Sequence, residues 1–259
     1  MDIIELLWQL HNDPGMVLEP AQAAILQATI SNEPELAFDA GQSAQLNLLQ
    51  RWLDQGSEIG GWKIGMTSGA NRNAMGDGIR PFGYVLKERI YQSGARLELS
   101  DLHNGQVENE LAFIMGEHLG AGATADAAFA AVAGVLPAFE INQKRLPGSA
   151  SSGLRVADDL SNYGIVVGTP VSPIRDLSQL TVTLSHTNGK VIEAVASAGH
   201  IDDHYESLAI LARRLDQFGQ ALKPGHVVIT GAYGKTPFAA GSFTGHFDQG
   251  IGTVEVTLA

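Results

Sequence analysis

The stretch Gln106-Val107-Glu108-Asn109-Glu110-Leu111-Ala112-Phe113-Ile114-Met115-Gly116 sets two glutamates into an otherwise apolar run. This pattern predicts a β-strand, on which side chains two positions apart point to the same face. Glu108 and Glu110 then head together toward a largely buried surface, where two like charges are costly unless something neutralises them. A hard divalent cation would do so, because carboxylate oxygens suit Mg²⁺, Mn²⁺ and Ca²⁺. The alternative is a half-exposed edge strand with solvated glutamates, which the pair by itself favours.

A third carboxylate, Glu140, stands in the apolar run 134–142, which predicts a second strand. A lone acid in such a run is usually paired with a base or bound to a metal. Lys144 and Arg145 follow closely, so a structural ion pair is the alternative for Glu140. Three acids on two apolar strands nevertheless favour a cation site.

The composition indicates a globular protein with a substantial core. With 259 residues, the chain fits one large domain, or a main domain with a small appendage. A hydrophobic content of 44% suffices for a core, and 17% charged residues argue against disorder. The formal net charge of -12 argues against nucleic acid and anionic membrane surfaces as partners, since no basic cluster offsets it. A small acidic substrate would need a metal or a nearby Lys or Arg that makes the electrostatic potential at the site positive.

The chain contains no cysteine, which excludes disulfides, thiolate metal sites and a cysteine nucleophile, and which fits a reducing compartment. Residues 1–5 lack the layout of a signal peptide, in which basic residues precede an apolar segment. No apolar run approaches the length of a membrane span. We therefore expect a cytoplasmic protein.

Helical patterns fill the first part of the chain, and strand patterns dominate the rest. Helices are predicted over about 3–11 with Asp2 as the cap, over about 20–30, and from Asp39 or Ser43 to about 55. Further helices are predicted over 123–133 and from Asp202 or Asp203 to about 218. The predicted strands cover 62–66, 82–86, 96–99, 107–115, 135–142, 163–168, 180–186, 190–198, 227–230, 242–247 and 252–258. Thr187-Asn188-Gly189 predicts a hairpin between two of them.

This order of elements predicts an α+β fold. A helical N-terminal cap over residues 1–58 would sit on a β-rich catalytic core over residues 59–259.

Lys63 stands in a glycine-flanked, apolar strand, Gly60-Gly61-Trp62-Lys63-Ile64-Gly65. It either extends its ammonium group to water or is a desolvated lysine of lowered pKa that moves protons. Beside a metal held by the three glutamates, Lys63 would be a natural acid/base partner. The polar segment 156–164 is either an ordinary turn or gives Asp158 or Ser161 to the site.

The sequence disfavours four other motifs. His200 and His204 have a spacing that can bind Zn²⁺, but the glutamate of His-Glu-x-x-His is missing, and Asp202 and Asp203 are good helix caps. A P-loop would need glycine where Ile229 stands. No dinucleotide-binding or serine-hydrolase motif is present.

In this order, Gly61-Trp62-Lys63-Ile64-Gly65-Met66-Thr67-Ser68, Glu108-x-Glu110 and Pro137-Ala138-Phe139-Glu140 form a specific combination. It resembles the 2-keto-4-pentenoate hydratase / 4-oxalocrotonate decarboxylase group of the fumarylacetoacetate hydrolase superfamily. The likeness runs from about residue 35 to the C-terminus, and it includes Val156-Ala157-Asp158 leading to Ser161, and the segment 223–231.

The resemblance implies a β-roll core with a helical N-terminal part, assembled into homo-oligomers. It implies Mg²⁺ or Mn²⁺ held by Glu108, Glu110 and Glu140, with Lys63 as acid/base and Ser161 as a substrate contact. The implied activity is that of a metal-dependent lyase on a small 2-oxo or 2-hydroxydienoic acid, as in aromatic meta-cleavage catabolism. Hydration is the leading hypothesis, and decarboxylation of a 2-oxo-3-enedioate is the alternative.

One position departs from the pattern of this group. Hydratases of the group commonly carry Pro-Asp-Phe-Gly with the Asp as a proposed acid/base, whereas this chain has Arg80-Pro81-Phe82-Gly83, and proline cannot take a proton. The decarboxylase branch often lacks this Asp, so the change shifts weight toward decarboxylation or a variant substrate. Asp77 is the nearest acid in sequence.

Arg80 either faces the pocket and binds a second carboxylate of the substrate, or lies at the surface. Two further hypotheses stay open. One is C–C hydrolysis of an acylpyruvate, for which a glutamate would need His118 or His200 as a partner. The other is a non-catalytic partner subunit.

Overall fold

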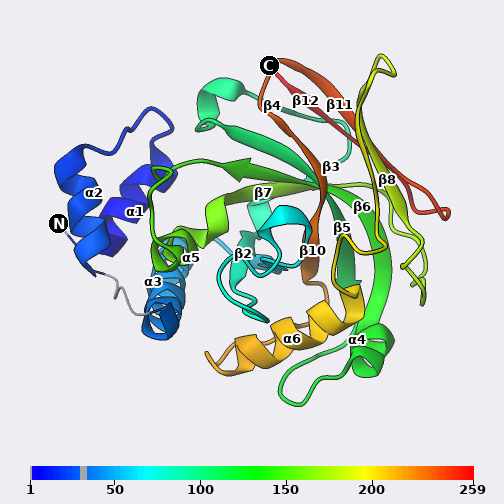
Figure 1. Ribbon diagram of the computed structural model, residues 1–259, viewed down its shortest axis with the longest axis horizontal. Helices are drawn as coiled ribbons and strands as arrows, with labels where there is room; N and C mark the ends of the chain where they lie inside the picture. Colours follow the sequence, from blue (N-terminus) through cyan, green and yellow to red (C-terminus); the bar gives the residue numbers. More distant parts are fainter. Residues whose placement is uncertain (1, 30–33) are drawn as a thin grey trace.

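A curled seven-stranded sheet forms the centre of the computed structural model (Figure 1), which describes residues 2–29 and 34–259. Its order is β2-β1-β10-β5-β6-β7-β3, with both parallel and antiparallel neighbours. The strands are β1 (Ile59–Ile64), β2 (Phe82–Leu86), β3 (Ile90–Gln92), β5 (Gly105–Met115), β6 (Val132–Gln143), β7 (Asn162–Val167) and β10 (Val227–Pro237). The curl brings β2 into contact with β7, although four strands separate them in the sheet order. The Asn162 side-chain amide on β7 donates to the carbonyl oxygen of Tyr84 on β2 (2.7 Å).

A second, five-stranded sheet has the order β4-β12-β11-β8-β9. Its strands are β4 (Ala95–Leu97), β8 (Thr181–His186), β9 (Val191–Ala196), β11 (Gly241–Phe247) and β12 (Gly252–Leu258). β8 and β9 pair antiparallel across Thr187-Asn188-Gly189, which confirms the predicted hairpin.

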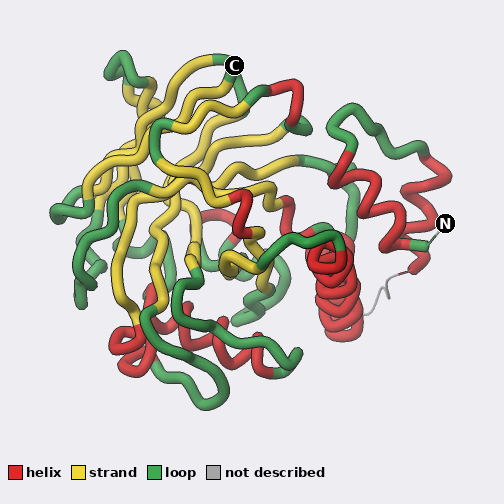
Figure 2. Tube along the Cα trace, turned by 180° about the vertical axis from the view of Figure 1, so that it is seen from behind, coloured by secondary structure: helices red, strands yellow, loops and turns green. Residues whose placement is uncertain are grey.

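Helices lie at one end and along one side of the molecule, as both views show (Figures 1 and 2). α1 (Ile3–Asn12), α2 (Pro20–Thr29) and α3 (Pro34–Asp54) gather at the end, whereas α4 (Ala125–Ala131) and α6 (His204–Asp216) contact one another elsewhere. The Asp2 side chain caps α1 by accepting from the Glu5 N–H (2.8 Å). None of the helices in the described residues combines the length and the apolar character that a membrane span requires.

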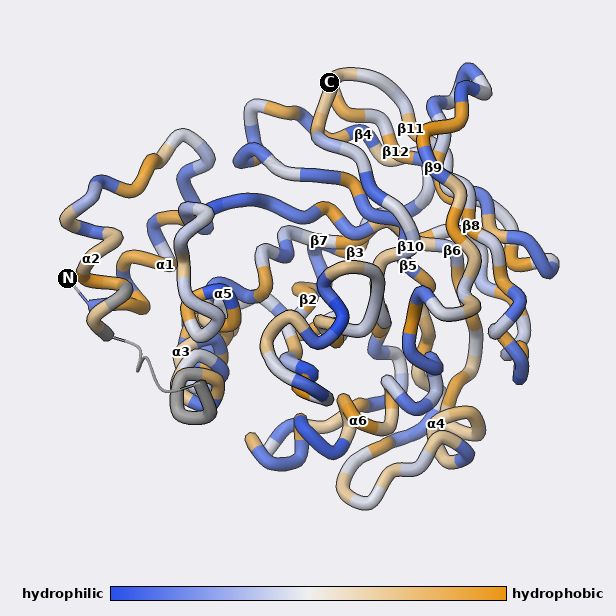
Figure 3. The backbone as a smooth tube through the Cα atoms, in the orientation of Figure 1, coloured by the Kyte–Doolittle hydropathy of each residue, from blue (hydrophilic) through white to orange (hydrophobic). Residues whose placement is uncertain are grey.

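Period-two alternation along β5 assigns its residues to two different cores. Val107, Leu111 and Phe113 join the main hydrophobic core, whereas Ala112 joins a smaller one on the other face of the sheet. Hydrophobic and hydrophilic segments accordingly alternate along the strands (Figure 3). Glu108 and Glu110 lie on the same face of β5 as Ala112. Further along the strand this face is apolar and packs in the smaller core.

The predicted α+β class, with a helical N-terminal part on a mixed β-roll core, is confirmed. Four elements differ most from the prediction. α3 begins earlier, at Pro34; β3 and the short helix α5 (Ser152–Ala157) were not predicted; and β10 continues to Pro237 through Gly231, where a strand end was predicted. Ile30, predicted as the end of the second helix, lies outside the described residues. The division at residues 58 and 59 stays a prediction.

The contact between α3 and α5 depends on a residue without a side chain. A Cβ atom at Gly41 of α3 would lie 2.3 Å from the carbonyl oxygen of Gly153 in α5. Next to Gly41, the buried Gln45 amide donates to the carbonyl oxygens of Phe82 (2.9 Å) and Val156 (2.7 Å). α3 therefore fixes both β2 and the segment that leads into the site.

We expect Gly41→Ala to lower the free energy of unfolding by about 1–3 kcal/mol, because overpacking outweighs the gain in helix propensity. Urea denaturation of the variant measures this change, with Ala40→Ser at the exposed neighbouring position as the control. A Gly41→Ala protein as stable as the wild type would contradict the close approach of the two helices.

Candidate functional site

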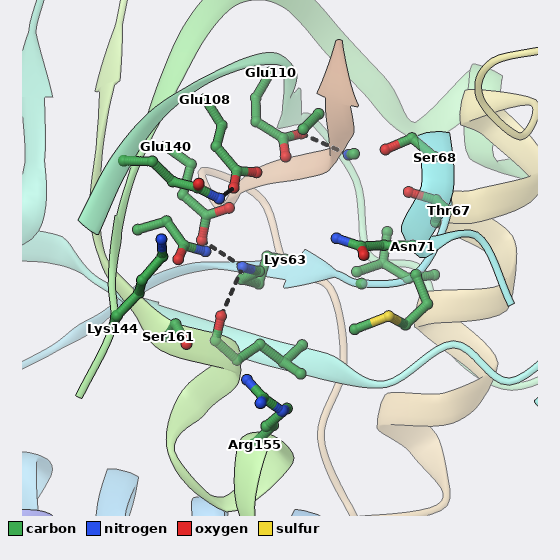
Figure 4. A pocket seen from close by; sticks show the side chains of 18 residues that line it. Lys63, Thr67, Ser68, Asn71, Glu108, Glu110, Glu140, Lys144, Arg155 and Ser161 are labelled. Carbon is green, nitrogen blue, oxygen red and sulfur yellow. Dashed lines mark hydrogen bonds and ion pairs between the residues drawn. The ribbon is translucent and has the colours of Figure 1, made fainter. Parts of the chain in front are cut away.

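Three carboxylates converge where β5 pairs with β6. Glu108 and Glu140 are direct partners in the antiparallel register, and Glu110 lies two positions along on the same face. One oxygen atom from each of the three lies within 4.8 Å of the others. Figure 4 shows them around the side chain of Lys63. Glu110 and Glu140 are almost fully buried.

Each carboxylate has a hydrogen-bond donor beside it. The Gly231 N–H donates to Glu110 Oε2 (2.5 Å), the Gln106 amide donates to Glu108, and the Lys63 ammonium pairs with Glu140. The Gly231 donor depends on an irregularity in β10, where the register with β5 shifts. Gly231 has φ +132°, and a Cβ atom there would lie 2.2 Å from Thr67 Oγ1. Only glycine fits this position.

Lys63 lies on β1, between β2 and β10, and its side chain is nearly buried. Its ammonium group pairs with Glu140 and also donates to the carbonyl oxygen of Leu160 (3.4 Å). Burial alone would lower the pKa of Lys63, but the neighbouring carboxylates, Glu140 first, outweigh it and raise the pKa above the usual value. This direction is opposite to the lowered pKa that the sequence analysis considered.

The donor set fits a hard divalent cation. Burial, followed by the charge of Glu140, raises the pKa of Glu108, and the same causes raise the pKa of Glu110 well above its usual value. Three carboxylates facing one ammonium group leave excess negative charge in a poorly solvated place. Oxygen donors of this kind are the ligands that Mg²⁺, Mn²⁺ and Ca²⁺ prefer.

A turn with an unusual backbone forms the wall opposite the carboxylates. Asp159, Leu160 and Ser161 are consecutive non-glycine residues with φ of 55°, 49° and 67°. This left-handed conformation costs roughly 1–2 kcal/mol per residue. It aims the Leu160 carbonyl at Lys63 and brings Ser161 to the cavity. Strain of this kind persists where surrounding contacts impose it, and it concentrates at functional sites.

Buried polar contacts hold this turn on both sides. Arg145 Nε donates to Asp158 Oδ1 (2.8 Å), and its Nη2 donates to the carbonyl oxygens of Asp158 and Asn162 (both 3.0 Å). His11 Nε2 also donates to Asp158 Oδ1 (3.0 Å). Asp159 Oδ1 accepts from the Tyr84 N–H (2.8 Å). The turn is thus tied to α1, to β2 and to the segment that follows β6.

These contacts correct two expectations. Asp158, predicted as a substrate contact, is fully buried, pairs with Arg145 and His11, and is absent from the cavity lining. Arg145, considered as an ion-pair partner of Glu140, is engaged by Asp158 instead. Although burial opposes it, the charge of Arg145 and the bond from His11 hold the pKa of Asp158 below its usual value.

Arg80 also lies outside the cavity. Its nearly buried guanidinium pairs with Asp202 (2.7 Å) and donates to Asn73 (2.7 Å), and its side chain lines a different hollow. Pro81, on the position of the group's Asp, is buried next to it. Asp77 is exposed, accepts from Asn73, and does not line the cavity.

The cavity has a volume of about 240 Å³. Lys63, the three glutamates and Ser161 line it, as the sequence predicts. It also has polar lining residues that were not predicted as site residues from the sequence: Thr67, Ser68, Asn71, Gln106, Asn142, Lys144 and Arg155. Gln106 and Asn142 lie two positions from Glu108 and Glu140 on the same strands, so the period of two could have found them.

Histidines support the site from outside. Neither His118 nor His200 lines the cavity, so neither supplies the Glu-His pair expected of a hydrolase. The Asp203 side chain caps α6, which confirms the predicted capping. His204, next along α6, is buried and contacts Thr230 Oγ1 (2.7 Å) and Tyr233 Oη (2.6 Å) on either side of Gly231. This pair of contacts fixes the bulge that presents the Gly231 N–H.

Burial lowers the pKa of His204 to about 4, against 6.5 for the unfolded chain. Between these values the unfolded state binds the proton more readily, so His204 costs up to about 3 kcal/mol of stability as pH falls from 6.5 to 4. We expect His204→Gln to flatten the dependence of the free energy of unfolding on pH over this range. Exposed His118→Gln is the control. Equal slopes for the wild type and His204→Gln would contradict the assignment.

Comparisons with known proteins identify the relatives of this chain. No protein-family model matches the chain. A 4-oxalocrotonate decarboxylase of Pseudomonas sp is 31% identical over 186 residues, 71% of this chain and 72% of the relative. A 2-keto-4-pentenoate hydratase of Paraburkholderia xenovorans is 30% identical over 208 residues, 78% of this chain and 76% of the relative.

Among solved structures, the 4-oxalocrotonate decarboxylase from Pseudomonas putida G7, complexed with magnesium and adipate, superposes with a TM-score of 0.80. It is 25% identical, and the match covers 98% of both chains. The sequence matches cover more than two thirds of the chain and the fold match covers nearly all of it, so the chain belongs to the 2-keto-4-pentenoate hydratase / 4-oxalocrotonate decarboxylase family of the fumarylacetoacetate hydrolase superfamily.

Proposed function

We propose that this protein is a divalent-metal-dependent lyase of small 2-oxo or 2-hydroxydienoic acids, with hydration of a 2-keto-4-pentenoate-type substrate as its reaction. The observation that carries the proposal is the convergence of three buried carboxylates and one ion-paired lysine on a single small cavity. A structural ion pair would need one carboxylate for one lysine, so the two additional carboxylates call for a further cation.

In this proposal Glu108, Glu110 and Glu140 hold Mg²⁺ or Mn²⁺. Such a cation, when bound, acts as a Lewis acid that stabilises negative charge developing on the 2-oxo oxygen of the substrate. The magnesium in the related decarboxylase structure supports a divalent metal for this chain. Homo-oligomeric assembly and a cytoplasmic location remain predictions from the sequence.

Lys63 moves the proton in this proposal. Its ammonium group is held between Glu140 and the Leu160 carbonyl, so the Nζ position is fixed by two elements distant in sequence. A proton donor fixed in this way delivers its proton to one carbon of the substrate rather than to several. Ser161 contributes a hydroxyl from the strained turn for hydrogen bonding to the substrate.

Decarboxylation of a 2-oxo-3-enedioate is the second candidate, because it needs the same electron sink and because no aspartate stands at position 81. Asp159 is a buried carboxyl group near Lys63 that the sequence analysis did not single out. A Cβ atom at Gly83 would collide with both Asp159 Oδ1 and Lys63 Cγ, at 2.8 Å each. Asp159 is absent from the cavity lining, so we assign it the anchoring of the turn rather than contact with substrate.

We expect Glu108→Gln to bind Mg²⁺ and Mn²⁺ far more weakly and to reduce turnover by more than about 100-fold, because a stabilisation of several kcal/mol is lost. Isothermal titration with each metal measures binding independently of activity. Glu117→Gln, the same change at an exposed site just after β5, is the matched control. Unchanged metal binding and turnover in Glu108→Gln would refute the proposed site.

The reaction itself is decided by an ultraviolet assay with Mg²⁺. Metal-dependent loss of 2-hydroxypenta-2,4-dienoate without release of CO₂ is the expected result and identifies a hydratase. Release of CO₂ from a 2-oxo-3-enedioate would identify a decarboxylase instead. If neither chromophore changes, both candidate reactions are excluded for these substrates.

A further inference from the structure

Met66 is a strained residue in the lining of the cavity. Its φ angle is 62°, in the left-handed region that glycine adopts freely and that other residues rarely adopt. It is half-buried, and it lines the same cavity as Lys63 and the three glutamates. Glycine at this position would adopt the same backbone without strain. A strained residue beside reactive groups indicates a functional constraint on that position.

Hydrogen bonds on both sides of Met66 impose its backbone conformation. Before it, the Gly65 N–H donates to the carbonyl oxygen of Pro81 (2.8 Å). After it, Thr67 Oγ1 donates to the carbonyl oxygen of Thr230 (2.8 Å). These contacts involve no atom of the Met66 side chain. They therefore explain why the backbone is left-handed here, but they do not explain why the residue is a methionine.

The Met66 side chain is not part of a hydrophobic core. Three hydrophobic clusters occur in the part of the chain that the structure describes, and Met66 belongs to none of them. The other lining residues with apolar side chains are Ile64, Leu160 and Ala232. Ile64 and Leu160 are buried within two of these clusters, and the side chain of Ala232 is short. Packing in a core therefore does not account for the large apolar side chain of Met66, whereas contact with the contents of the cavity does.

The space around Met66 is limited. The cavity volume of about 240 Å³ is below the roughly 300–1,000 Å³ that is usual for pockets that bind drug-sized ligands. Figure 4 shows the neighbouring Thr67 and Ser68 across the cavity from Lys144. In a cavity of this size, one long side chain in the wall decides how much room remains for the substrate.

We propose that Met66 forms the wall at which the hydrocarbon tail of the substrate ends, and that it thereby limits the length of that tail. This inference rests on the proposed function, which places the 2-oxo acid end of the substrate at the three glutamates. A short tail, as in 2-keto-4-pentenoate, contacts the thioether side chain, and a longer tail collides with it. The unbranched, polarisable side chain of methionine adapts well to a flat unsaturated tail.

Two unreactive ligands of different length test the proposal without relying on turnover. 2-Oxopentanoate and 2-oxoheptanoate share the 2-oxo acid group, lack the double bond that either reaction requires, and differ only in the length of the tail. With wild-type protein and saturating Mg²⁺, we expect isothermal titration to show about 10- to 200-fold tighter binding of 2-oxopentanoate, the range for a hydrophobic pocket that discriminates by tail length.

Substitutions at position 66 separate the wall from the strain. Met66→Gly removes the wall and keeps the left-handed backbone, so 2-oxoheptanoate should bind at least as tightly as 2-oxopentanoate. Met66→Ala should show the same change in preference, but with a lower urea midpoint than Met66→Gly, because alanine keeps the strain. Met66→Leu fills a similar volume and should retain the preference for the shorter ligand.

Gln249→Gly is the matched control. Gln249 is also a left-handed residue other than glycine, with a φ angle of 56°, but it is exposed and lies outside the cavity lining. The variant therefore removes strain without changing the cavity, and it should bind both ligands as the wild type does.

The failures are distinguishable. Wild-type protein that binds 2-oxoheptanoate as tightly as 2-oxopentanoate would overturn the length limit and leave the proposed function standing. A preference for the shorter ligand that survives in both Met66→Gly and Met66→Ala would overturn the assignment to Met66. If neither ligand binds in the presence of Mg²⁺, the proposed function fails, and this inference fails with it.

Discussion

The ion pair between Lys63 and Glu140 depends on the curl of the central sheet. β1 and β6 are separated by β10 and β5 in the strand order, so on a flat sheet their backbones would be about 14 Å apart. The curl that also brings β2 to β7 shortens this gap enough for the two side chains to meet. The acidic cluster needs only the pairing of β5 with β6, whereas the approach of Lys63 and the cavity between them follow from this closure of the sheet.

The closure is maintained by polar contacts that are costly to break. The Asn162 side chain on β7 donates to the Tyr84 carbonyl, and Asp159 accepts from the Tyr84 N–H. Both backbone groups of Tyr84 on β2 therefore bind the turn and the start of β7. The buried Arg145–Asp158 pair, supported by His11, holds the other side. Removing one partner of such a pair leaves an uncompensated buried charge. The strained turn is therefore stabilised by contacts from α1, from β2 and from Arg145 just after β6.

Residue patterns within single segments correctly predicted several of the strands. The strands over 82–86 and 252–258 agree residue for residue, and the alternation along 107–115 correctly placed Glu108 and Glu110 on one face. Residue spacing did not determine which distant charges would pair. Lys144 and Arg145 were the candidates for Glu140, whereas the strand order and the curl bring Lys63 to it. α5 was missed because six residues are too few to display a helical period, and with it the analysis missed Arg155.

Two of the four hydrogen bonds described for Lys63 and the three glutamates involve backbone groups. The Gly231 N–H donates to Glu110, and the Leu160 carbonyl accepts from Lys63. Substitution by alanine deletes no backbone group, so an alanine scan of the lining that spares Gly231 would leave both partners in place. The φ angles and close contacts of Gly231 and Leu160 limit which residues can replace them. The side chains alone therefore do not account for the hydrogen bonds of this site. The backbone conformation at Gly231 and Leu160 supplies the remaining donor and acceptor.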